Sequence, residues 1–308
     1  MTITQLQYVL AVSDYLSFVK AAEACFVTQP TLSMQIQKLE DELNVKLFDR
    51  SKQPIKPTQA GEIVSKNARI ILQQTKTLTD ELAIEKGVVA GTLKIGIIPT
   101  VAGYLLPLFI QNFTTKYPLI KLVVNELTTE EIIERLKKET IDAAILATPL
   151  TEKMLHETPM YYEPFIAYVN KKSPMAKFKQ LQMSDLDKDK LWILKEGHCW
   201  RNQVFNLCNI NHNFDEGFEY ETGNLETLKK MVDINGGFTI LPALSVAEFG
   251  MAETNKLRYF QEPEPVREIS IVTHRDYYKK NLINALKEVI LNAIPEKMKM
   301  KKTTPIKI

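Results

Sequence analysis

Apolar residues recur at helical spacing through the N-terminal part of the chain. Leu6, Val9 and Val12 mark a first amphipathic helix, and Ser17 and Thr28 stand immediately before two further stretches with helical spacing. Serine and threonine are preferred helix N-caps, because the side-chain oxygen accepts a hydrogen bond from a free backbone amide. The pattern therefore predicts three short helices, and the third is expected to bury Leu32, Ile36, Leu39 and Leu43.

A single long helical pattern follows, from Gln59 to about Glu85. Its apolar positions form one narrow stripe among polar and charged residues. A long helix of this kind usually packs against a partner helix. The stripe consists of Ile63, Ile70, Ile71, Leu72, Leu78 and Leu82.

Beyond residue 90 the helical spacing gives way to short apolar runs typical of buried strands. These runs lie at 93–98, 121–124, 143–146 and 165–169, and helical stretches at 104–117 and 130–139 separate some of them. Glycines at positions 87 and 91 mark a hinge before the first run. The sequence therefore predicts an α/β protein with an all-α N-terminal part, organised as residues 1–58, 59–90 and 91–308.

Composition places the chain among ordinary globular proteins, with 308 residues, 45% hydrophobic, 25% charged and a net charge of +2. The N-terminus lacks a basic segment followed by an apolar run, and no apolar stretch reaches the roughly 18 residues of a membrane span. We therefore expect a cytoplasmic protein that does not associate with a membrane. Structural disulfides are rare in that compartment, whereas reversible ones commonly serve as sensors or catalysts.

The polar face of the third predicted helix carries side chains suited to DNA. Pro30 falls in the first turn, where its missing amide hydrogen costs nothing. Glutamine can bridge the edge of adenine, whereas hydroxyls and lysine can contact phosphates. Periodicity alone favours a plain amphipathic helix with a solvated polar face. The side chains concerned are Gln29, Thr31, Ser33, Gln35 and Lys38.

Three segments resemble the DNA-binding signature of the LysR-type transcriptional regulators: QPTLSMQIQKLEDEL at 29–43, LFDR at 47–50 and TQAG at 58–61. The resemblance implies a winged helix-turn-helix with its wing at about 50–57. It also implies a dimerisation linker helix and a two-lobed regulatory domain similar to periplasmic binding proteins. Met34 departs from the pattern, because members of the family carry glycine or a basic residue there.

The same resemblance implies contacts with double-stranded promoter DNA and RNA polymerase, and a homodimer or homotetramer. Between Lys46 and Arg69 basic residues outnumber acidic ones, which suits contacts with phosphates. The residues expected to bind DNA are Gln29, Pro30, Thr31, Ser33, Gln35, Lys38, Arg50 and Lys52.

Two cysteines, Cys199 and Cys208, stand nine positions apart in the segment EGHCWRNQVFNLC. His198 and Arg201 flank the first, and nearby positive charge favours the reactive thiolate. If the segment is helical, the two Cα atoms lie roughly 13 Å apart, whereas a disulfide needs less than about 7 Å. Formation of the bond would then rebuild the local fold.

Two other interpretations of these cysteines stay open. Cytosolic cysteines are often small buried hydrophobes, and a zinc site could use His198, Cys199, Cys208 and His212. The cysteine spacing is wider than in usual zinc motifs, and the side chains of adjacent residues diverge, so zinc is the weaker alternative. Cys25 lies in an apolar stretch and is assigned no redox role. We predict no bound metal and no cofactor.

The segment around the two cysteines resembles the sensing loop of the peroxide-responsive branch of the LysR-type regulators. The short segments at 98–101, 104–107, 126–129 and 263–267 resemble those that surround the reactive cysteine in that branch. The resemblance implies that peroxide oxidises Cys199 and that Cys208 resolves the product to a disulfide. A thioredoxin or glutaredoxin system would reduce it. The residues implied around hydrogen peroxide are Thr100, Thr129, His198, Arg201 and Arg267.

Without the resemblance, Thr100 and Thr129 would be interpreted as strand-end caps and Arg267 as a surface charge. Two rival functions remain. A LysR-type regulator of a small metabolite would use the two threonines to hold a carboxylate, and a thiol peroxidase would use the same cysteine for turnover. The helix-turn-helix argues against an enzyme, and the cysteine pair argues against a metabolite regulator.

Overall fold

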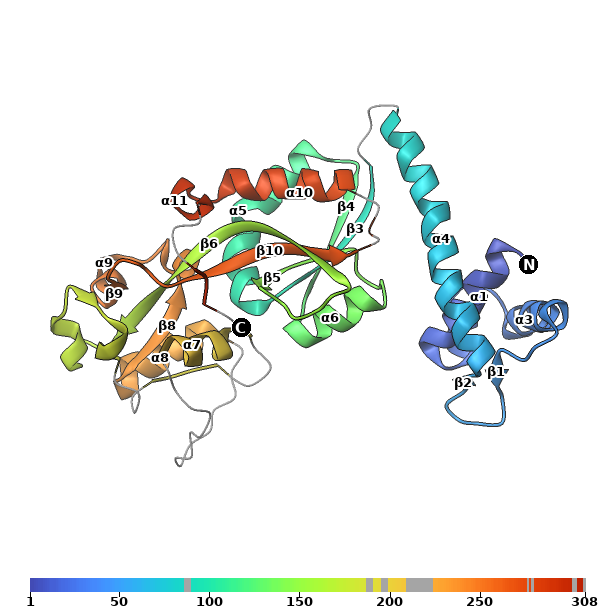
Figure 1. Cartoon of the computed structure of the whole chain (residues 1–308), viewed down its shortest axis with the longest axis horizontal. Coiled ribbons are helices and arrows are strands. Elements are labelled where there is room, and N and C mark those ends of the chain that lie inside the picture. Colours follow the sequence, from blue (N-terminus) through green and yellow to red (C-terminus); the bar gives the residue numbers. More distant parts are fainter. Residues whose placement is uncertain are drawn as a thin grey trace. The chain divides into compact units, whose positions relative to one another are not determined.

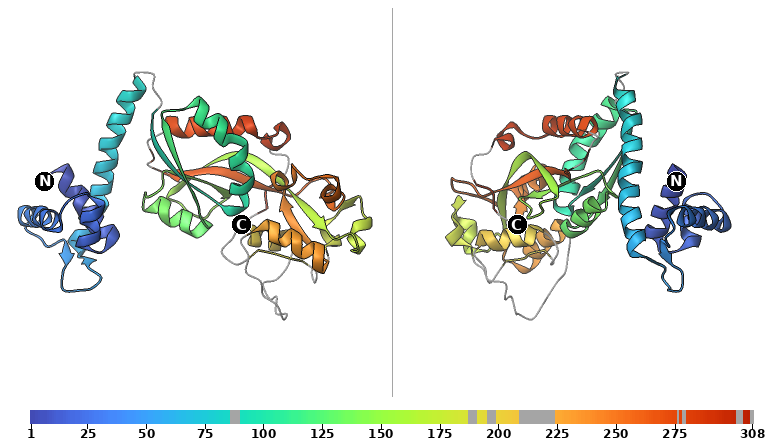
Figure 2. Two further views of the ribbon diagram at one scale, coloured as in Figure 1. Left: turned by 180° about the vertical axis from the view of Figure 1, so that it is seen from behind. Right: turned by 45° about the vertical axis from the view of Figure 1, so that its right-hand side comes forward.

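The computed structural model describes residues 1–85, 90–186, 191–194, 199–208, 224–275, 277, 280–300 and 304–306. The chain divides into two compact units, Met1–Val88 and Val89–Ile308, and each is considered by itself. Figure 1 shows a helical N-terminal unit and a larger unit built around a sheet, and Figure 2 gives two further views.

Three short helices open the N-terminal unit: α1 (Ile3–Tyr15), α2 (Phe18–Ala24) and α3 (Gln29–Leu43). The predicted caps are confirmed, because Ser17 accepts a hydrogen bond from the amide of Lys20 and Thr28 accepts one from the amide of Thr31. Pro30 lies in the first turn of α3. These local signals fix where the helices begin.

The apolar side of α3 supplies the core of this unit. Leu32, Ile36 and Leu39 are fully buried against residues of α1 and α2. The prediction for Leu43 is wrong, because that side chain is 37% exposed. Leu43 is the last residue of α3, and Asn44 follows in a left-handed conformation that turns the chain away from the core.

A small antiparallel hairpin follows, formed by β1 (Phe48–Asp49) and β2 (Lys56–Pro57), at the position predicted for the wing. The long helix α4 (Gln59–Glu85) then begins close to the hairpin. A side chain at Gly61 would place its Cβ only 2.0 Å from the carbonyl oxygen of Leu47, so the close approach requires glycine. The predicted stripe of α4 includes four exposed apolar side chains, Ile63, Ile70, Ile71 and Leu78.

The second unit is built on a mixed sheet in the order β4-β3-β5-β10-β6-β9-β7, with β8 also pairing with β6. The strands are β3 (Gly91–Ile97), β4 (Ile120–Glu126), β5 (Ala143–Thr148), β6 (Leu155–Val169), β7 (Gln180–Leu181), β8 (Phe238–Pro242), β9 (Leu257–Phe260) and β10 (Val266–His274). Four predicted strands are confirmed, although the run at 165–169 is only the end of the longer strand β6.

The helices of this unit are α5 (Pro99–Lys116), α6 (Thr129–Lys137), α7 (Cys199–Cys208), α8 (Leu225–Asn235), α9 (Met251–Thr254), α10 (Lys280–Ala293) and α11 (Glu296–Lys299). Short 3₁₀ turns lie at Pro174–Lys177, Met183–Asp185 and Ala243–Val246. The helices α5 and α10 pack against each other, as Figure 1 shows.

Two strands connect the two lobes of this unit. The first part of β6 pairs with β10 beside β5, whereas its end, Phe165–Val169, pairs with β8 and β9. The strands β3, β4 and β5 with α5 and α6 form one lobe, and β7, β8 and β9 with α7 and α8 form the other. This arrangement confirms the predicted two-lobed α/β fold.

Candidate functional site

Cys199 is the first residue of α7 and is almost fully buried. Its sulfur lies near the backbone amide of Ala147 at the end of β5 and near the hydroxyl of Thr129 at the start of α6. Strands β3, β4 and β5 run parallel, so their carboxyl ends meet at one edge of the sheet. A residue of the second lobe therefore meets the carboxyl edge of the first, where α/β proteins generally place their sites.

The start of α6 is fixed by a capping box. The Thr128 hydroxyl accepts a hydrogen bond from the amide of Glu131, and the Glu131 carboxylate accepts one from the amide of Thr128. Thr129 is consequently the first helical residue, and its hydroxyl is buried beside Cys199. It is therefore not the cap that the alternative interpretation requires.

Burial raises the pKa of the Cys199 thiol, because a thiolate is poorly solvated there. The Thr129 hydroxyl, the charge of Arg267 and the backbone amides of Trp200 and Ala147 oppose this shift but do not overcome it. The thiol form is therefore favoured in this structure, although the charge of Arg267 acts in favour of the thiolate.

The Thr129 hydroxyl is close enough to the sulfur to stabilise a thiolate, yet it has no well-formed hydrogen bond to any described residue. The two groups are therefore close together but poorly aligned for a hydrogen bond. A buried hydroxyl without a partner is costly. Such a group is well suited to bind a small polar molecule that reaches Cys199.

Arg267 lies on β10 and is 1% exposed, so the alternative of a surface charge is wrong. Its Nε and Nη2 donate to one carboxylate oxygen of Glu163 at 3.0 and 2.8 Å. Its Nη1 and Nη2 donate to the hydroxyl and carbonyl oxygens of Thr100 at 2.9 and 3.0 Å. The guanidinium also stacks 4.5 Å from the ring of Trp200. Arg267 thereby joins strand β10 to α5 and α7.

Sequence reasoning missed three residues of this cluster: Glu163, Trp200 and Tyr161. Glu163 is 1% exposed, and its second oxygen accepts a hydrogen bond from the amide of Leu244 at 2.8 Å. Trp200 stacks on Phe165 at 4.9 Å. The buried hydroxyl of Tyr161 has no hydrogen-bond partner within the described ranges. The available signal in the sequence is a single glutamate within the mostly apolar second half of β6, because a carboxylate in such a run needs a partner.

Three further residues were predicted for the redox site, namely Arg201, His198 and Cys208. Arg201 is half-buried, donates to the carbonyl oxygen of Leu194 at 3.3 Å and lies 5.0 Å from the Phe205 ring. It is not among the groups that shift the pKa of Cys199. His198 lies outside the described residues, as does the side chain of Cys208. The roles of all three residues stay predictions.

The condition on the segment between the two cysteines is met: it is helical, because α7 runs from Cys199 to Cys208. Nine residues of helix separate the two Cα atoms by roughly 13 Å, too far for a disulfide.

The described residues hold no metal-binding cluster, while His198 and His212 of the alternative zinc site lie outside them. Cys25 is half-buried, and burial raises its pKa as well.

The N-terminal unit contains the predicted DNA-binding residues. Gln29, Pro30, Thr31 and Lys38 are exposed on α3, whereas Ser33 and Gln35 are half-buried. Ser33 accepts a hydrogen bond from Arg50 at 3.2 Å, and Gln35 accepts one from Gln5 of α1 at 3.4 Å. These two residues therefore contact other parts of the protein, and their roles in base recognition stay predictions.

Arg50 joins the hairpin to α3. Its guanidinium lies 4.8 Å from the Phe18 ring and 3.6 Å from the carboxylate of Glu40, which also accepts a hydrogen bond from the amide of Leu47. Lys52, also predicted to bind DNA, pairs with Asp49 at 3.3 Å.

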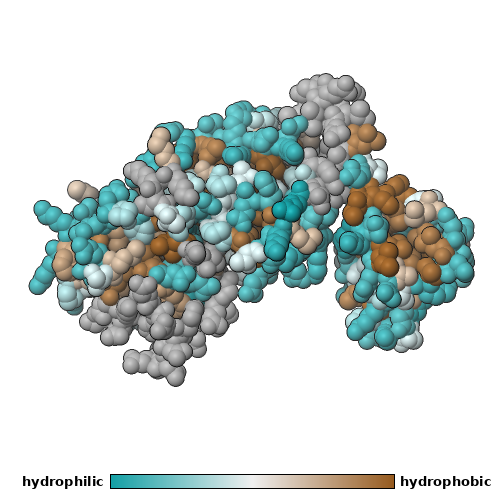
Figure 3. Space-filling model, in the orientation of Figure 1, coloured by the Kyte–Doolittle hydropathy of each residue, from teal (hydrophilic) through white to brown (hydrophobic). Residues whose placement is uncertain are grey.

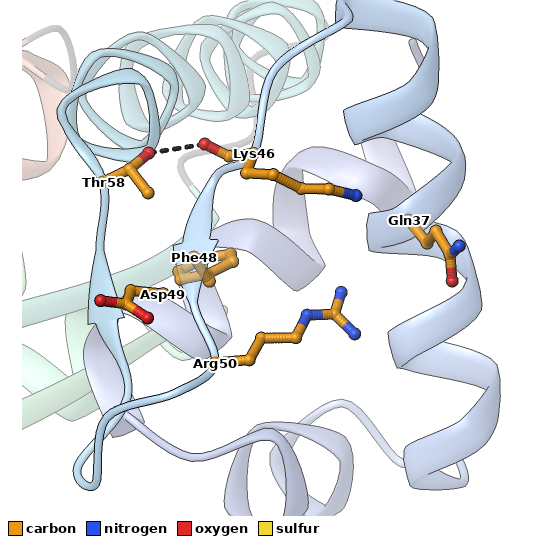
Figure 4. A pocket seen from close by; sticks show the side chains of 6 residues that line it. All are labelled: Gln37, Lys46, Phe48, Asp49, Arg50 and Thr58. Carbon is orange, nitrogen blue, oxygen red and sulfur yellow. Dashed lines mark hydrogen bonds between the residues drawn. The ribbon is translucent and has the colours of Figure 1, made fainter.

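An open pocket of about 490 Å³ lies between α3 and the hairpin, lined by Gln37, Lys46, Phe48, Asp49, Arg50 and Thr58. In Figure 4 the cationic ends of Lys46 and Arg50 both point toward α3. This arrangement suits the negatively charged backbone of DNA.

Two family models match the chain. The model "Bacterial regulatory helix-turn-helix protein, lysR family" matches residues 3–62, and the model "LysR substrate binding domain" matches residues 86–295. A "Hydrogen peroxide-inducible genes activator" from Pectobacterium carotovorum subsp. carotovorum is 36% identical over 88% of this chain and 90% of its own. The chain belongs to the LysR family of transcriptional regulators.

Further relatives place this LysR-type regulator in the OxyR group. The "DNA-binding transcriptional dual regulator OxyR" of Escherichia coli (strain K12) is 35% identical over 88% of this chain and 89% of its own. A full-length OxyR variant from Pseudomonas aeruginosa superposes with a TM-score of 0.77 at 30% identity, covering 94% of this chain and 98% of its own. No helix in the described part is long and apolar enough to cross a membrane.

Proposed function

We propose that this regulator senses hydrogen peroxide through Cys199 and controls oxidative-stress genes by altering how it acts on promoter DNA. The observation that carries the proposal is the buried thiol of Cys199 beside the unpartnered hydroxyl of Thr129. Thr100, which accepts from Arg267, still has its own hydroxyl hydrogen to donate. The names of the relatives support peroxide as the signal.

The chemistry takes place in two steps. The thiolate of Cys199 attacks one oxygen of hydrogen peroxide, the O–O bond breaks, and the departing hydroxide takes up a proton to form water. The sulfur becomes a sulfenic acid. The thiol of Cys208 then attacks that sulfur, a disulfide forms, and a second water leaves. A thioredoxin or glutaredoxin system returns both sulfurs to thiols.

The second step requires α7 to unfold, because its two ends are roughly 13 Å apart as a helix. A bridge closing so short a loop stabilises the rearranged state by roughly 2 to 3 kcal/mol through chain entropy. This stabilisation shifts a two-state equilibrium by about tenfold to a hundredfold. The rearrangement would move Trp200 and Phe205, which are buried in α7. Oxidation thereby changes the packing between the lobes.

The regulator acts in the cytoplasm as a homodimer or homotetramer and is not an enzyme. The exposed apolar side chains of α4 support the assembly, because they need a covering partner. Figure 3 shows that apolar side chains gather on the visible face of the N-terminal unit. RNA polymerase is the expected partner at the promoter.

A carboxylate metabolite is the rival ligand for the same site. Arg267 is the obvious cation for it, but Glu163 already pairs with that guanidinium. Neutralisation of the charge disfavours an anionic ligand. The structure therefore offers more support for an uncharged ligand such as hydrogen peroxide.

Mass spectrometry after stoichiometric peroxide tests the proposal. Cys208→Ser should give a sulfenic acid on residue 199 that dimedone traps, and the parent protein should give a Cys199–Cys208 disulfide. Cys25→Ser is the matched control and should behave like the parent. A transcriptional response to peroxide that persists in Cys199→Ser would contradict the proposal.

A further inference from the structure

The exposed face of α3 has an apolar residue at its centre. Helical spacing aligns Thr31, Met34 and Lys38 along one line, with Pro30 and Gln37 beside them. All five are exposed, and Met34 is 50% exposed. The buried positions Leu32, Ile36 and Leu39 lie on the opposite side. Met34 is therefore on the side of the helix that is free to enter a groove.

Most polar side chains around Met34 are already engaged within the protein. The engaged pairs are Thr31 with Thr28 at 2.8 Å, Ser33 with Arg50 at 3.2 Å and Gln35 with Gln5 at 3.4 Å. Within the described chain, Gln37 and Lys38 have no hydrogen-bond or ion-pair partner. Of the residues from position 31 onward, the face consequently offers Met34, Gln37 and Lys38 to a ligand.

The surroundings of this face favour DNA as its occupant. Lys46 is 67% exposed, and it lines the pocket between α3 and the hairpin together with Gln37 and Arg50. Cations at this edge can hold phosphates on either side of an inserted helix. Scattered apolar residues are common on protein surfaces. Met34, however, occupies the middle of the exposed side of α3, a helix within the segment that matches the lysR-family helix-turn-helix model.

We propose that Met34 is a specificity-determining residue that contacts the C5 methyl group of a thymine in the major groove. Methionine has no group that can donate a hydrogen bond to a base edge, whereas its flexible thioether packs well on apolar surface. The thymine methyl is the apolar group that the major groove presents. The proposal concerns the DNA-binding face and is independent of the chemistry at Cys199.

A methyl-deletion experiment on the DNA isolates this contact. The full-length reduced protein first selects its duplex from a random library. Each thymine of that duplex is then replaced in turn by uracil, which lacks only the C5 methyl group. We expect one uracil substitution in each half-site to weaken binding about fourfold, the usual effect of removing one buried methyl group.

Protein variants assign the effect to Met34. Met34→Ala should bind the thymine and uracil duplexes equally, whereas Met34→Leu should keep the preference because it keeps an apolar side chain. Met251→Ala, an exposed methionine of the regulatory unit, is the matched control and should behave like the parent. The proposal is overturned if no uracil substitution weakens binding, or if the thymine preference survives in Met34→Ala.

Discussion

Each of the two units of this regulator contains an arginine–glutamate pair, and the two pairs have the same kinds of neighbours. Arg50 and Arg267 each lie on an aromatic ring, at 4.8 and 4.5 Å, and each donates to a hydroxyl, Ser33 or Thr100. Their partners, Glu40 and Glu163, are both buried, and each also accepts a hydrogen bond from a backbone amide at 2.8 Å.

The pairs differ in the exposure of the arginine. The side chain of Arg50 is 42% exposed and 3.6 Å from its carboxylate, whereas that of Arg267 is 1% exposed and 2.8 Å away. Water screens the first pair and leaves its arginine able to exchange the carboxylate for a phosphate. The second pair has no such alternative. The same set of side chains can thus serve a binding surface or fix the electrostatics of a buried thiol.

Removal of the buried arginine should have the largest effect. Arg267→Ala leaves Glu163 buried and unpaired, so we expect the free energy of unfolding of the regulatory unit to fall by about 3 to 5 kcal/mol. Urea denaturation measures it. The double variant Arg267→Met with Glu163→Gln should recover most of the loss, because no unpaired charge remains. A loss below about 1 kcal/mol in Arg267→Ala would mean that the buried pair contributes no more to stability than an exposed ion pair does, and would contradict the prediction.

The pH dependence of oxidation probes the charge that Cys199 experiences. Burial raises the pKa of the thiol above its ordinary value of 9.0, so the reactive thiolate is the minor form at neutral pH. The rate of reaction with peroxide should therefore increase about tenfold for each pH unit between about pH 6 and pH 8. Stopped-flow measurements on reduced protein provide the profile. A rate that is flat over this range would instead support activation by His198 and Arg201.

Removal of the Thr129 hydroxyl should slow oxidation by about tenfold to a hundredfold, because a hydrogen bond to a charged group contributes about 1.5 to 3 kcal/mol. Thr129→Val nearly preserves the volume, and Thr140→Val removes an exposed hydroxyl as the matched control. Affinity for DNA in the reduced state should stay the same in both. Equal oxidation rates for Thr129→Val and the parent would remove this residue from the mechanism.

Arg50→Ala should have the smallest effect on stability, less than about 1 kcal/mol. We expect it to weaken binding to cognate and random duplexes alike and to lower the salt dependence by about one phosphate contact. Fluorescence anisotropy across a salt series measures the affinity for each duplex and its salt dependence. If the salt dependence is unchanged, the guanidinium stays on Glu40 in the complex and only positions the hairpin.

Local chemistry made much of the fold predictable. Ser17 and Thr28 cap helix starts through contacts within one turn, and Pro30 suits a first helical turn. The runs at 143–146 and 165–169 are apolar because both faces of these strands are buried. The predicted burial of Leu43 is wrong because periodicity does not reveal that Asn44 ends the helix.

The site was less predictable because its contacts join distant positions. Glu163 and Arg267 are separated by 104 residues, and Gln5 and Gln35 by 30. The resemblance singled out Cys199, Thr100 and Thr129, but not the carboxylate that neutralises Arg267. Sequence alone also does not show that burial outweighs neighbouring charge at the thiol.

The stacking of Trp200 gives the sensing unit an optical property of its own. Trp200 is one of two tryptophans in the chain, it follows Cys199 directly, and it packs on both the Phe165 ring and the Arg267 guanidinium. Indole emission shifts to longer wavelength when water replaces an apolar environment. Unfolding of α7 would therefore shift the emission maximum of Trp200, so the oxidation step could be followed by intrinsic tryptophan fluorescence without an added dye.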